Sequence, residues 1–202
     1  MFIEQPTFLL KSIYPKGIFR KDPSDHCVYL TFDDGPIPEV TPWVLDQLDS
    51  HEVKATFFVV GDNVKKYPDL FKDLQARGHT VGNHTFNHVR GLQMRTPDYI
   101  SNVRKCDAYF KTDLFRPPHG TMRHWAYRYM SSSYKIVFYD LVTRDYSDRM
   151  TGTEVFRNVC KYTRNGSIIV FHDSLRSWKN LEYALPRSLD WLADQGFQFR
   201  TL

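Results

Sequence analysis

The sequence predicts an α/β protein: one closed or nearly closed, distorted (β/α) barrel of about seven parallel strands with crossover helices. Apolar runs rich in β-branched and aromatic residues alternate along the chain with amphipathic segments. A strand, a helix and a second strand in succession form a parallel pair, and seven such units in about 175 residues suit a barrel. The expected strands are residues 27–32, 55–60, 79–82, 113–116, 135–141, 167–172 and 197–201.

Helix signals stand between these strands. Thr41, Thr96 and Thr153 each precede an amphipathic segment and can cap its first turn, and a proline follows the first two. The regular return of these signals supports the alternation of strands and helices. Helix C-caps are expected at three glycines that follow amphipathic segments, Gly78, Gly166 and Gly196.

The chain is expected to form an N-terminal arm over residues 1–26 and a single domain over residues 27–202. No Gly/Ser linker, repeat or low-complexity run divides it. The arm has no apolar stretch longer than three residues, so we expect neither a signal peptide nor a membrane helix, and a cytoplasmic location by default. The arm is expected to pack beside the first strand through Phe8, Leu9, Leu10 and Ile18.

Composition argues against several classes of function. The net charge of +4 comes from 27 basic and 23 acidic residues dispersed along the chain, which gives no support to nucleic-acid binding. A local basic cluster at Arg123, His124 and Arg128 is interpreted as a solvated helix face. The cysteines lack a CxxC spacing and are expected to be small core residues in a reducing compartment: Cys27, Cys106 and Cys160.

Chemically capable side chains follow the expected strands. The run VYLTFDDGP, Val28 to Pro36, reads as a buried strand that ends in two carboxylates and a Gly-Pro turn. Because the C-terminal ends of parallel strands share one rim of a barrel, residues far apart in the chain are expected to converge there. They are Asp33, Asp34, His84, His88, Arg116, Asp145, His172 and Asp173.

The sequence HTFNH places His84 and His88 four positions apart. On a helical turn this spacing lets both imidazoles face one ion. Two neutral imidazoles with one carboxylate, Asp34 or Asp33, form a facial triad that leaves coordination positions open for water and substrate. The pattern therefore predicts a catalytic metal site.

Four motifs together resemble one family. TFDDGP, HTFNH, RPPHG at residues 116–120 and IIVFHD ending at Asp173 are similar to the successive motifs of the polysaccharide deacetylases, also called the NodB-homology or carbohydrate esterase family 4 enzymes. The resemblance implies a NodB-like barrel and one divalent metal ion, Zn²⁺ as the first expectation with Co²⁺ or Ni²⁺ as alternatives. It also implies removal of acetyl groups from sugar polymers.

The resemblance assigns a role to each matched position. Asp33 resembles the general base, Asp34 the metal carboxylate, His84 and His88 the metal imidazoles, Arg116 the partner of the base, His172 the general acid and Asp145 the residue that orients this acid. Three positions depart from the family pattern: the family often has an aromatic residue at His119, Trp at Tyr146 and Leu at Val170. The residues expected to contact substrate are Pro118, His119, Tyr146 and Val170, and the backbone N–H of His119 is expected to meet the oxyanion.

The expected reaction is hydrolysis of N-acetyl groups on N-acetylglucosamine-containing glycans, with release of acetate. An acetamide needs a polarised carbonyl, an activated water and a proton for the departing amine, and the matched residues offer a candidate for each. Trp125 and Trp178 are the tryptophans expected to stack on a sugar ring. An O-acetyl esterase acting on xylan and a noncatalytic sugar-binding barrel remain alternatives, and a dinuclear phosphodiesterase is a weaker one. The glycan and the oligomeric state stay open.

Overall fold

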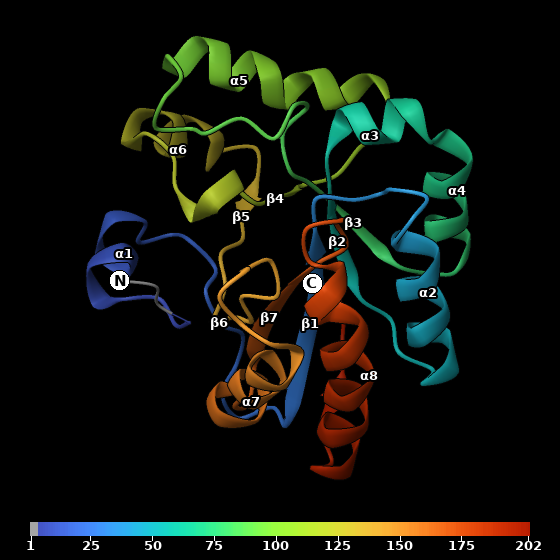
Figure 1. Cartoon of the computed structure of the whole chain (residues 1–202). Coiled ribbons are helices and arrows are strands. Elements are labelled where there is room, and N and C mark those ends of the chain that lie inside the picture. The colour runs from blue at the N-terminus through green and yellow to red at the C-terminus, as the bar shows by residue number, and fades with distance from the viewer. Residues whose placement is uncertain (1–3) are drawn as a thin grey trace.

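A computed structural model describes residues 4–202 as one curled parallel sheet with helices around it (Figure 1). Seven strands follow one another in the order β5-β4-β3-β2-β1-β7-β6, and the eighth, β8, pairs with β1. This confirms the predicted distorted barrel of parallel strands, although β5 and β6 stand at the two ends of the strand order. The strands are β1 (Cys27–Asp33), β2 (Thr56–Val59), β3 (Thr80–Asn83), β4 (Leu114–Phe115), β5 (Lys135–Ile136), β6 (Leu141–Val142), β7 (Ser167–His172) and β8 (Gln198–Phe199).

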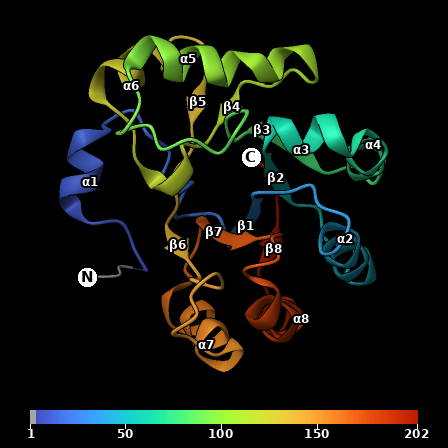
Figure 2. The same cartoon turned by 45° about the horizontal axis from the view of Figure 1, so that its top comes forward.

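The helices surround the strands (Figure 2). Alternate residues of β1 distinguish the two faces of the sheet. Val28, Leu30 and Phe32 belong to the main core that packs against the helices, whereas Tyr29 belongs to a separate cluster inside the curled sheet. None of the helices in the described range 4–202 is both long and apolar enough to cross a membrane. The helices are α1 (Phe8–Ile13), α2 (Thr41–Ser50), α3 (Gly61–Lys66), α4 (Pro68–Ala76), α5 (Thr96–Arg104), η1 (Lys105–Ala108), η2 (Pro118–Gly120), α6 (His124–Met130), α7 (Gly152–Tyr162) and α8 (Trp178–Asp194).

One of the expected strands is divided into two separate strands in the structure. The sequence predicts one strand over residues 135–141, but the first residues of this run form β5 beside β4 and its last residue starts β6 beside β7, at opposite ends of the sheet. The middle of the run pairs elsewhere, because Val137 bridges Ile18 of the N-terminal arm. Apolar periodicity marks burial, and it carries no information about which neighbour each half of a run will pair with.

The helix starts differ from the predicted caps. Thr41 and Thr96 are the first helical residues and not the caps, since Val40 and Arg95 precede them at the N-cap position. The helix near Thr153 starts with a capping box two residues earlier, in which Thr151 and Glu154 satisfy each other's backbone N–H. Because Val40 and not Thr41 is the N-cap of α2, the Thr41 hydroxyl can donate a hydrogen bond to the carboxyl group of Asp173.

The predicted glycine caps are right at two places and wrong at one. Gly78 and Gly196 follow α4 and α8 in the left-handed conformation, with φ of 82° and 78°. Gly166 is also left-handed, with φ of 74°, but it lies in the turn into β7 and not at the end of α7. A Cβ there would meet the backbone oxygen of Lys21 at 2.6 Å, so close packing against the N-terminal arm also demands glycine.

The N-terminal arm packs through residues that differ in part from those expected. Leu10 and Ile18 pack against core clusters, but Phe8 and Leu9 are 87% and 68% exposed, which contradicts their expected burial. The contact is made by Tyr14, whose hydroxyl donates to the backbone oxygen of Met122 at 2.6 Å. In an arm, hydrophobic residues at adjacent positions point to different sides, and residue type does not reveal which side meets the core.

Candidate metal centre and active site

The strand ends bring the predicted residues to one rim. Asp33 is the last residue of β1 and lies in register with His172, the last residue of β7. His84 directly follows β3, and Arg116 directly follows β4. Because side chains alternate along a strand, Asp33 shares a face with Tyr29, and His172 shares a face with Ile168, in the interior cluster of the curled sheet. Both reactive side chains therefore face the interior.

Backbone strain is concentrated in the loops at this rim. Six non-glycine residues in the described chain have positive φ, and five of them lie in loops that follow rim strands. Side chains rarely adopt this conformation unless the surrounding structure enforces it, and such residues cluster at functional sites. The five are Asp34, Thr85, His88, His119 and Arg144.

Asp34, His84 and His88, which we call the metal triad, could hold a metal ion. One ligand atom from each lies within 4.8 Å of the others. Asp34 Oδ1 is 3.7 Å from His84 Nε2 and 3.1 Å from His88 Nε2. The expected helical turn under this pair is wrong: residues 84–88 form a loop in which His88 has φ of 52°. The loop brings the imidazoles together all the same, with ring centroids 5.1 Å apart.

The metal triad has the properties that a divalent cation requires. Asp34 Oδ1 is buried and receives no hydrogen bond. Burial disfavours its charge, but His88, His172 and His84 outweigh burial and hold the pKa of Asp34 below its usual value. His84 Nδ1 donates to the backbone oxygen of Arg116 at 2.8 Å, which leaves the Nε2 lone pair free to bind a cation. Burial lowers the pKa of His84 to about 4, so its imidazole is neutral at pH 7. The three residues fit a cation.

The second carboxylate, Asp33, is held by an arginine instead. Arg116 Nη1 donates to Asp33 Oδ1 at 2.7 Å, and both side chains are almost fully buried. The same guanidinium also donates to Thr31 Oγ1 and to the backbone oxygen of Phe138, and it lies 4.0 Å from the centroid of the Phe58 ring. This fixed cation balances the charge of the buried carboxylate and orients it. The two adjacent aspartates therefore have different partners.

His172 is paired with Asp145. Asp145 is fully buried, and its two oxygens accept from the backbone N–H and from Nδ1 of His172 at 2.7 and 2.8 Å. The carboxylate cannot donate, so Nδ1 carries a proton and Nε2 is the free ring atom. Burial lowers the pKa of His172, but Asp145, together with Asp34 and Asp33, more than compensates and raises it to about 9. His172 is therefore charged at neutral pH.

The candidate substrate residues surround these groups. His119 is exposed, and its ring lies 5.0 Å from that of His88. Tyr146 packs edge-on against His172 at 4.9 Å, and Val170 lies two residues before His172 on the same face of β7. Pro118 is buried at the start of the turn that carries His119. Of the two predicted sugar-stacking tryptophans, Trp125 is 73% exposed, whereas Trp178 packs edge-on against Trp43.

Asp173 has a structural role that the sequence motifs left unassigned. Its Oδ1 accepts from the backbone N–H of Gly35 at 3.1 Å, and its Oδ2 accepts from Thr41 Oγ1 at 2.6 Å. A Cβ at Gly35 would collide with this carboxyl group. Asp173 therefore clamps the turn that follows Asp34 onto the end of β7. The Gly that directly follows two acids was the available signal, since close approach by another group is one reason for glycine at a turn.

A groove of about 390 Å³ opens beside the metal triad. Asp34 and His88 lie at its inner side, and it is large enough for a small ligand. Its remaining lining comes from the loops after β1, β2, β3 and β7 and from the first turn of α3, namely Ile37, Val60, Asp62, Asn63, Asn87, Ser174 and Leu175.

Comparison with known proteins gives consistent matches. Residues 20–135 match the family model described as Polysaccharide deacetylase. The chain is 32% identical to a peptidoglycan-N-acetylglucosamine deacetylase of Bacillus cereus over 87% of this chain and 66% of that protein. It is 34% identical to the peptidoglycan-N-acetylglucosamine deacetylase PgdA of Listeria monocytogenes over 87% of this chain and 38% of that protein. The chain thus spans less than two thirds of the length of these relatives.

The fold is shared with a solved enzyme structure. The crystal structure of the Bc1960 peptidoglycan N-acetylglucosamine deacetylase superposes with a TM-score of 0.89 and 28% sequence identity. The match covers 98% of this chain and 95% of that one. The strand order and the rim described above therefore belong to a fold that supports deacetylation in a similar protein.

Proposed function

Because the chain belongs to the polysaccharide deacetylase family, we propose that it removes N-acetyl groups from N-acetylglucosamine-containing glycans and releases acetate. The observation that supports this proposal is that the rim holds three separate groups, each with its own partners. The carboxylate of Asp34 lies in the metal triad, and that of Asp33 pairs with Arg116. The third group is the charged His172, which pairs with Asp145. Acetamide hydrolysis needs a group for each of these tasks.

A single divalent cation, Zn²⁺ in the first place, would be held by Asp34, His84 and His88. When bound, such an ion polarises the acetyl carbonyl and lowers the pKa of water. The neutral state of His84 and the buried Oδ1 of Asp34, which faces both imidazoles, support this ligand set. Two imidazoles and one carboxylate suit zinc and also cobalt or nickel.

Asp33 would act as the general base. Its Oδ1 is occupied by Arg116, so the free Oδ2, which lies 3.9 Å from His84 Nε2, is the atom that faces the metal triad. A carboxylate that is fixed in place can take a proton from an attacking water without first reorienting. Arg116 would not touch the reacting atoms, and it acts as the positioning residue of the base.

His172 would act as the general acid. An amine leaves a tetrahedral carbon only after its nitrogen is protonated, and Nε2 of the charged imidazole can supply that proton. Asp145 keeps the proton in place at neutral pH through the two hydrogen bonds described above. We assign oxyanion contact to the backbone N–H of His119, whose left-handed turn lies at the edge of the metal triad.

The His172–Asp145 pair favours an amide over an ester as the natural substrate. An alkoxide leaves with less help from an acid than an amine does, so a strongly charged acid is of most use against an amide. The relatives are named for peptidoglycan N-acetylglucosamine, which is one member of the proposed substrate class.

The test is acetate release from matched substrates. Metal-stripped protein is assayed on N-acetylchitooligosaccharides, peptidoglycan and O-acetylated xylan after addition of zinc, cobalt or nickel. We expect metal-dependent acetate release from the N-acetylated glycans and none from a His84→Ala, His88→Ala double variant. Release from xylan alone would replace the proposal with O-acetyl esterase activity. Binding of glycan without release from any substrate would indicate a noncatalytic sugar-binding protein.

A further inference from the structure

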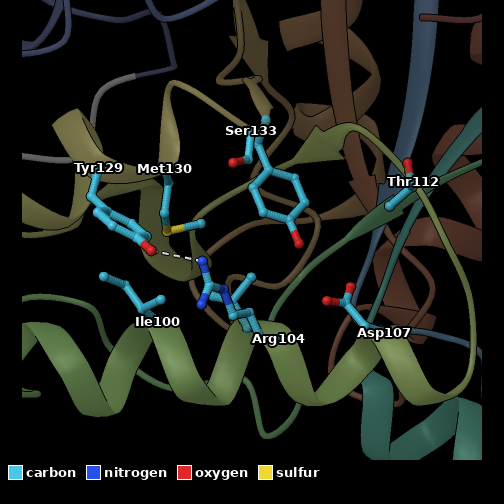
Figure 3. A pocket seen from close by; sticks show the side chains of 9 residues that line it. Ile100, Arg104, Asp107, Thr112, Tyr129, Met130 and Ser133 are labelled. Carbon is cyan, nitrogen blue, oxygen red and sulfur yellow. Dashed lines mark hydrogen bonds between the residues drawn. The ribbon is translucent and has the colours of Figure 1, made fainter.

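A second cavity lies away from the rim. It has a volume of about 460 Å³ and lies between α5 with η1 on one side and α6 on the other (Figure 3). Thr112 and Tyr134 of its lining precede β4 and β5, so it opens near the N-terminal ends of these strands. The reactive groups follow the C-terminal ends, and the two sites are therefore distinct. We call this space the side cavity; it is lined by Ile100, Val103, Arg104, Asp107, Thr112, Tyr129, Met130, Ser133 and Tyr134.

The side cavity combines an apolar floor with polar groups of both signs. Val103 and Met130 are buried and make the floor. Arg104 and Asp107 bring opposite charges to the same space, and Ser133 adds a hydroxyl (Figure 3). Because the charges balance, the lining does not select a simple anion or a metal cation. It suits a neutral ligand with several hydroxyls and one small apolar group.

Tyr129 is held as a platform at the edge of the side cavity. Arg104 Nη2 donates to the Tyr129 hydroxyl at 2.7 Å, and its guanidinium carbon is 5.4 Å from the ring centroid. These contacts restrain a side chain that is nevertheless 52% exposed. A restrained and exposed ring can accept the apolar face of a ligand at a small entropic cost.

Trp125 extends the platform along α6. It lies four residues before Tyr129, so the two side chains leave the helix on the same face. Trp125 is 73% exposed, and Arg128 lies 5.8 Å from its ring centroid. Helix α6 begins four positions after the turn that carries His119. Helix α6, which carries the aromatic pair Trp125 and Tyr129, therefore connects the turn of His119 with the side cavity, which Tyr129 lines.

We propose that the aromatic pair and the side cavity form an accessory site for an N-acetylhexosamine unit of the glycan substrate. The inference rests on the proposed function for its ligand class. The aromatic faces would take the C–H face of sugar rings. The acetyl methyl would lie on the floor made by Val103 and Met130, while Arg104, Asp107 and Ser133 bind amide and hydroxyl groups. The site would hold a part of the glycan strand that extends away from the catalytic rim.

Binding can be located directly, without reference to catalysis. Metal-stripped protein is titrated with N-acetylchitohexaose and followed by NMR, with the Trp125 indole N–H assigned from its loss in Trp125→Phe. We expect this signal to shift, and we expect the dissociation constant to rise about tenfold in a Trp125→Leu, Tyr129→Leu double variant. Phe8→Ala removes an even more exposed aromatic ring on α1 and serves as the control. A Trp125 signal that stays in place while hexaose binds overturns the proposal.

Kinetics separate this inference from the proposed function. The double variant should show a raised KM for N-acetylchitohexaose and an unchanged rate on 4-nitrophenyl acetate, which is too small to reach both sites. A loss of ester activity would show that the aromatic pair supports the rim itself, and it would overturn the accessory site. If N-acetylchitohexaose shifts the Trp125 signal of the wild-type protein but no acetate is released, the accessory site is supported and the proposed catalytic function is wrong.

Discussion

The metal triad and the two proton-transfer pairs lie at one rim, yet their polar atoms are satisfied in different ways. Asp33 and Asp145 each have a fixed partner within 2.8 Å, Arg116 and His172 respectively. In the metal triad, Asp34 Oδ1 is buried without a hydrogen bond. A buried acceptor without a donor is costly unless a cation completes it. The proton-transfer groups are thus ordered by the protein alone, whereas the metal triad leaves ligand atoms open that could hold an ion.

The largest expected effect comes from the metal triad. A His84→Ala, His88→Ala double variant should lose bound metal and nearly all activity, because two of three ligands are gone. Metal content by elemental analysis and acetate release measure this. His124→Ala, which removes an exposed histidine of α6, should change neither quantity. Retention of stoichiometric metal by the double variant would disprove the ligand set.

Separate replacement of the two adjacent aspartates by asparagine distinguishes the metal ligand from the base. Asp33→Asn should keep the metal but lose turnover by roughly 10²–10⁴-fold, because an amide cannot accept the proton of water. Asp34→Asn should instead lower metal affinity. Isothermal titration with zinc and acetate release would be measured on both variants. The reverse result, with metal lost in Asp33→Asn and kept in Asp34→Asn, would mean that the two roles are interchanged.

His172→Ala should affect amide and ester substrates unequally. Acetate release from an N-acetylglucosamine oligomer should fall by roughly 10²-fold or more, since the amine leaves only when protonated. Hydrolysis of 4-nitrophenyl acetate should fall much less, because its leaving group needs no acid. His119→Ala is the comparison variant, and it should retain the amide activity if only its backbone acts. Equal losses on both substrates in His172→Ala would point to His119 as the acid.

Asp145→Asn should give a milder effect with a diagnostic pH dependence. Asp145 raises the pKa of His172 to about 9 against the effect of burial, so its loss lowers that pKa. The acid form then disappears at lower pH, and the alkaline limb of kcat/KM for amide hydrolysis should move to lower pH. Asp148→Asn, at a side chain that is 82% exposed, should leave the limb in place. An unmoved limb in Asp145→Asn would contradict the pairing.

The smallest effect is expected at Asp173, which belongs neither to the metal triad nor to the proton-transfer pairs. Burial raises its pKa from 3.8 to about 8, so the native state binds a proton that the unfolded state releases. The free energy of unfolding of metal-free protein should therefore decrease as pH rises from about 4 to 8. Asp173→Asn lacks this titration and should lose less thermal stability between pH 6 and pH 9. An identical loss in both proteins, measured by calorimetry, would contradict the assignment.

Asp173→Ala tests the clamp itself. The backbone N–H of Gly35 would lose its acceptor, at a cost of about 1–3 kcal/mol, and the turn after Asp34 would be free to shift. We expect weaker zinc binding in this variant and near-normal zinc binding in Asp173→Asn, which retains an acceptor oxygen. Weakened binding in both would show that an acceptor oxygen at this position is not sufficient, and it would contradict the clamp.

Periodicity and turn chemistry were enough to predict the parallel strands and the rim. The run Val28 to Pro36 shows why: β-branched and aromatic residues mark a buried strand, and Gly35 with Pro36 marks its end. Motif order then assigned a role to each acid and imidazole. These are local properties, because a strand, a turn and a side chain's chemistry depend on residues near one another in the chain.

Only the tertiary structure decided the contacts between distant segments. Neighbouring Asp33 and Asp34 have the same chemistry, and their partners Arg116 and His88 come from other loops. The split of residues 135–141, the loop under the histidine pair and the clamp by Asp173 depend likewise on segments far away in sequence. The sequence by itself determined which groups reach the rim. Packing decided which atoms are paired there and which stay open, because hydrogen-bond partners are chosen by distance in space.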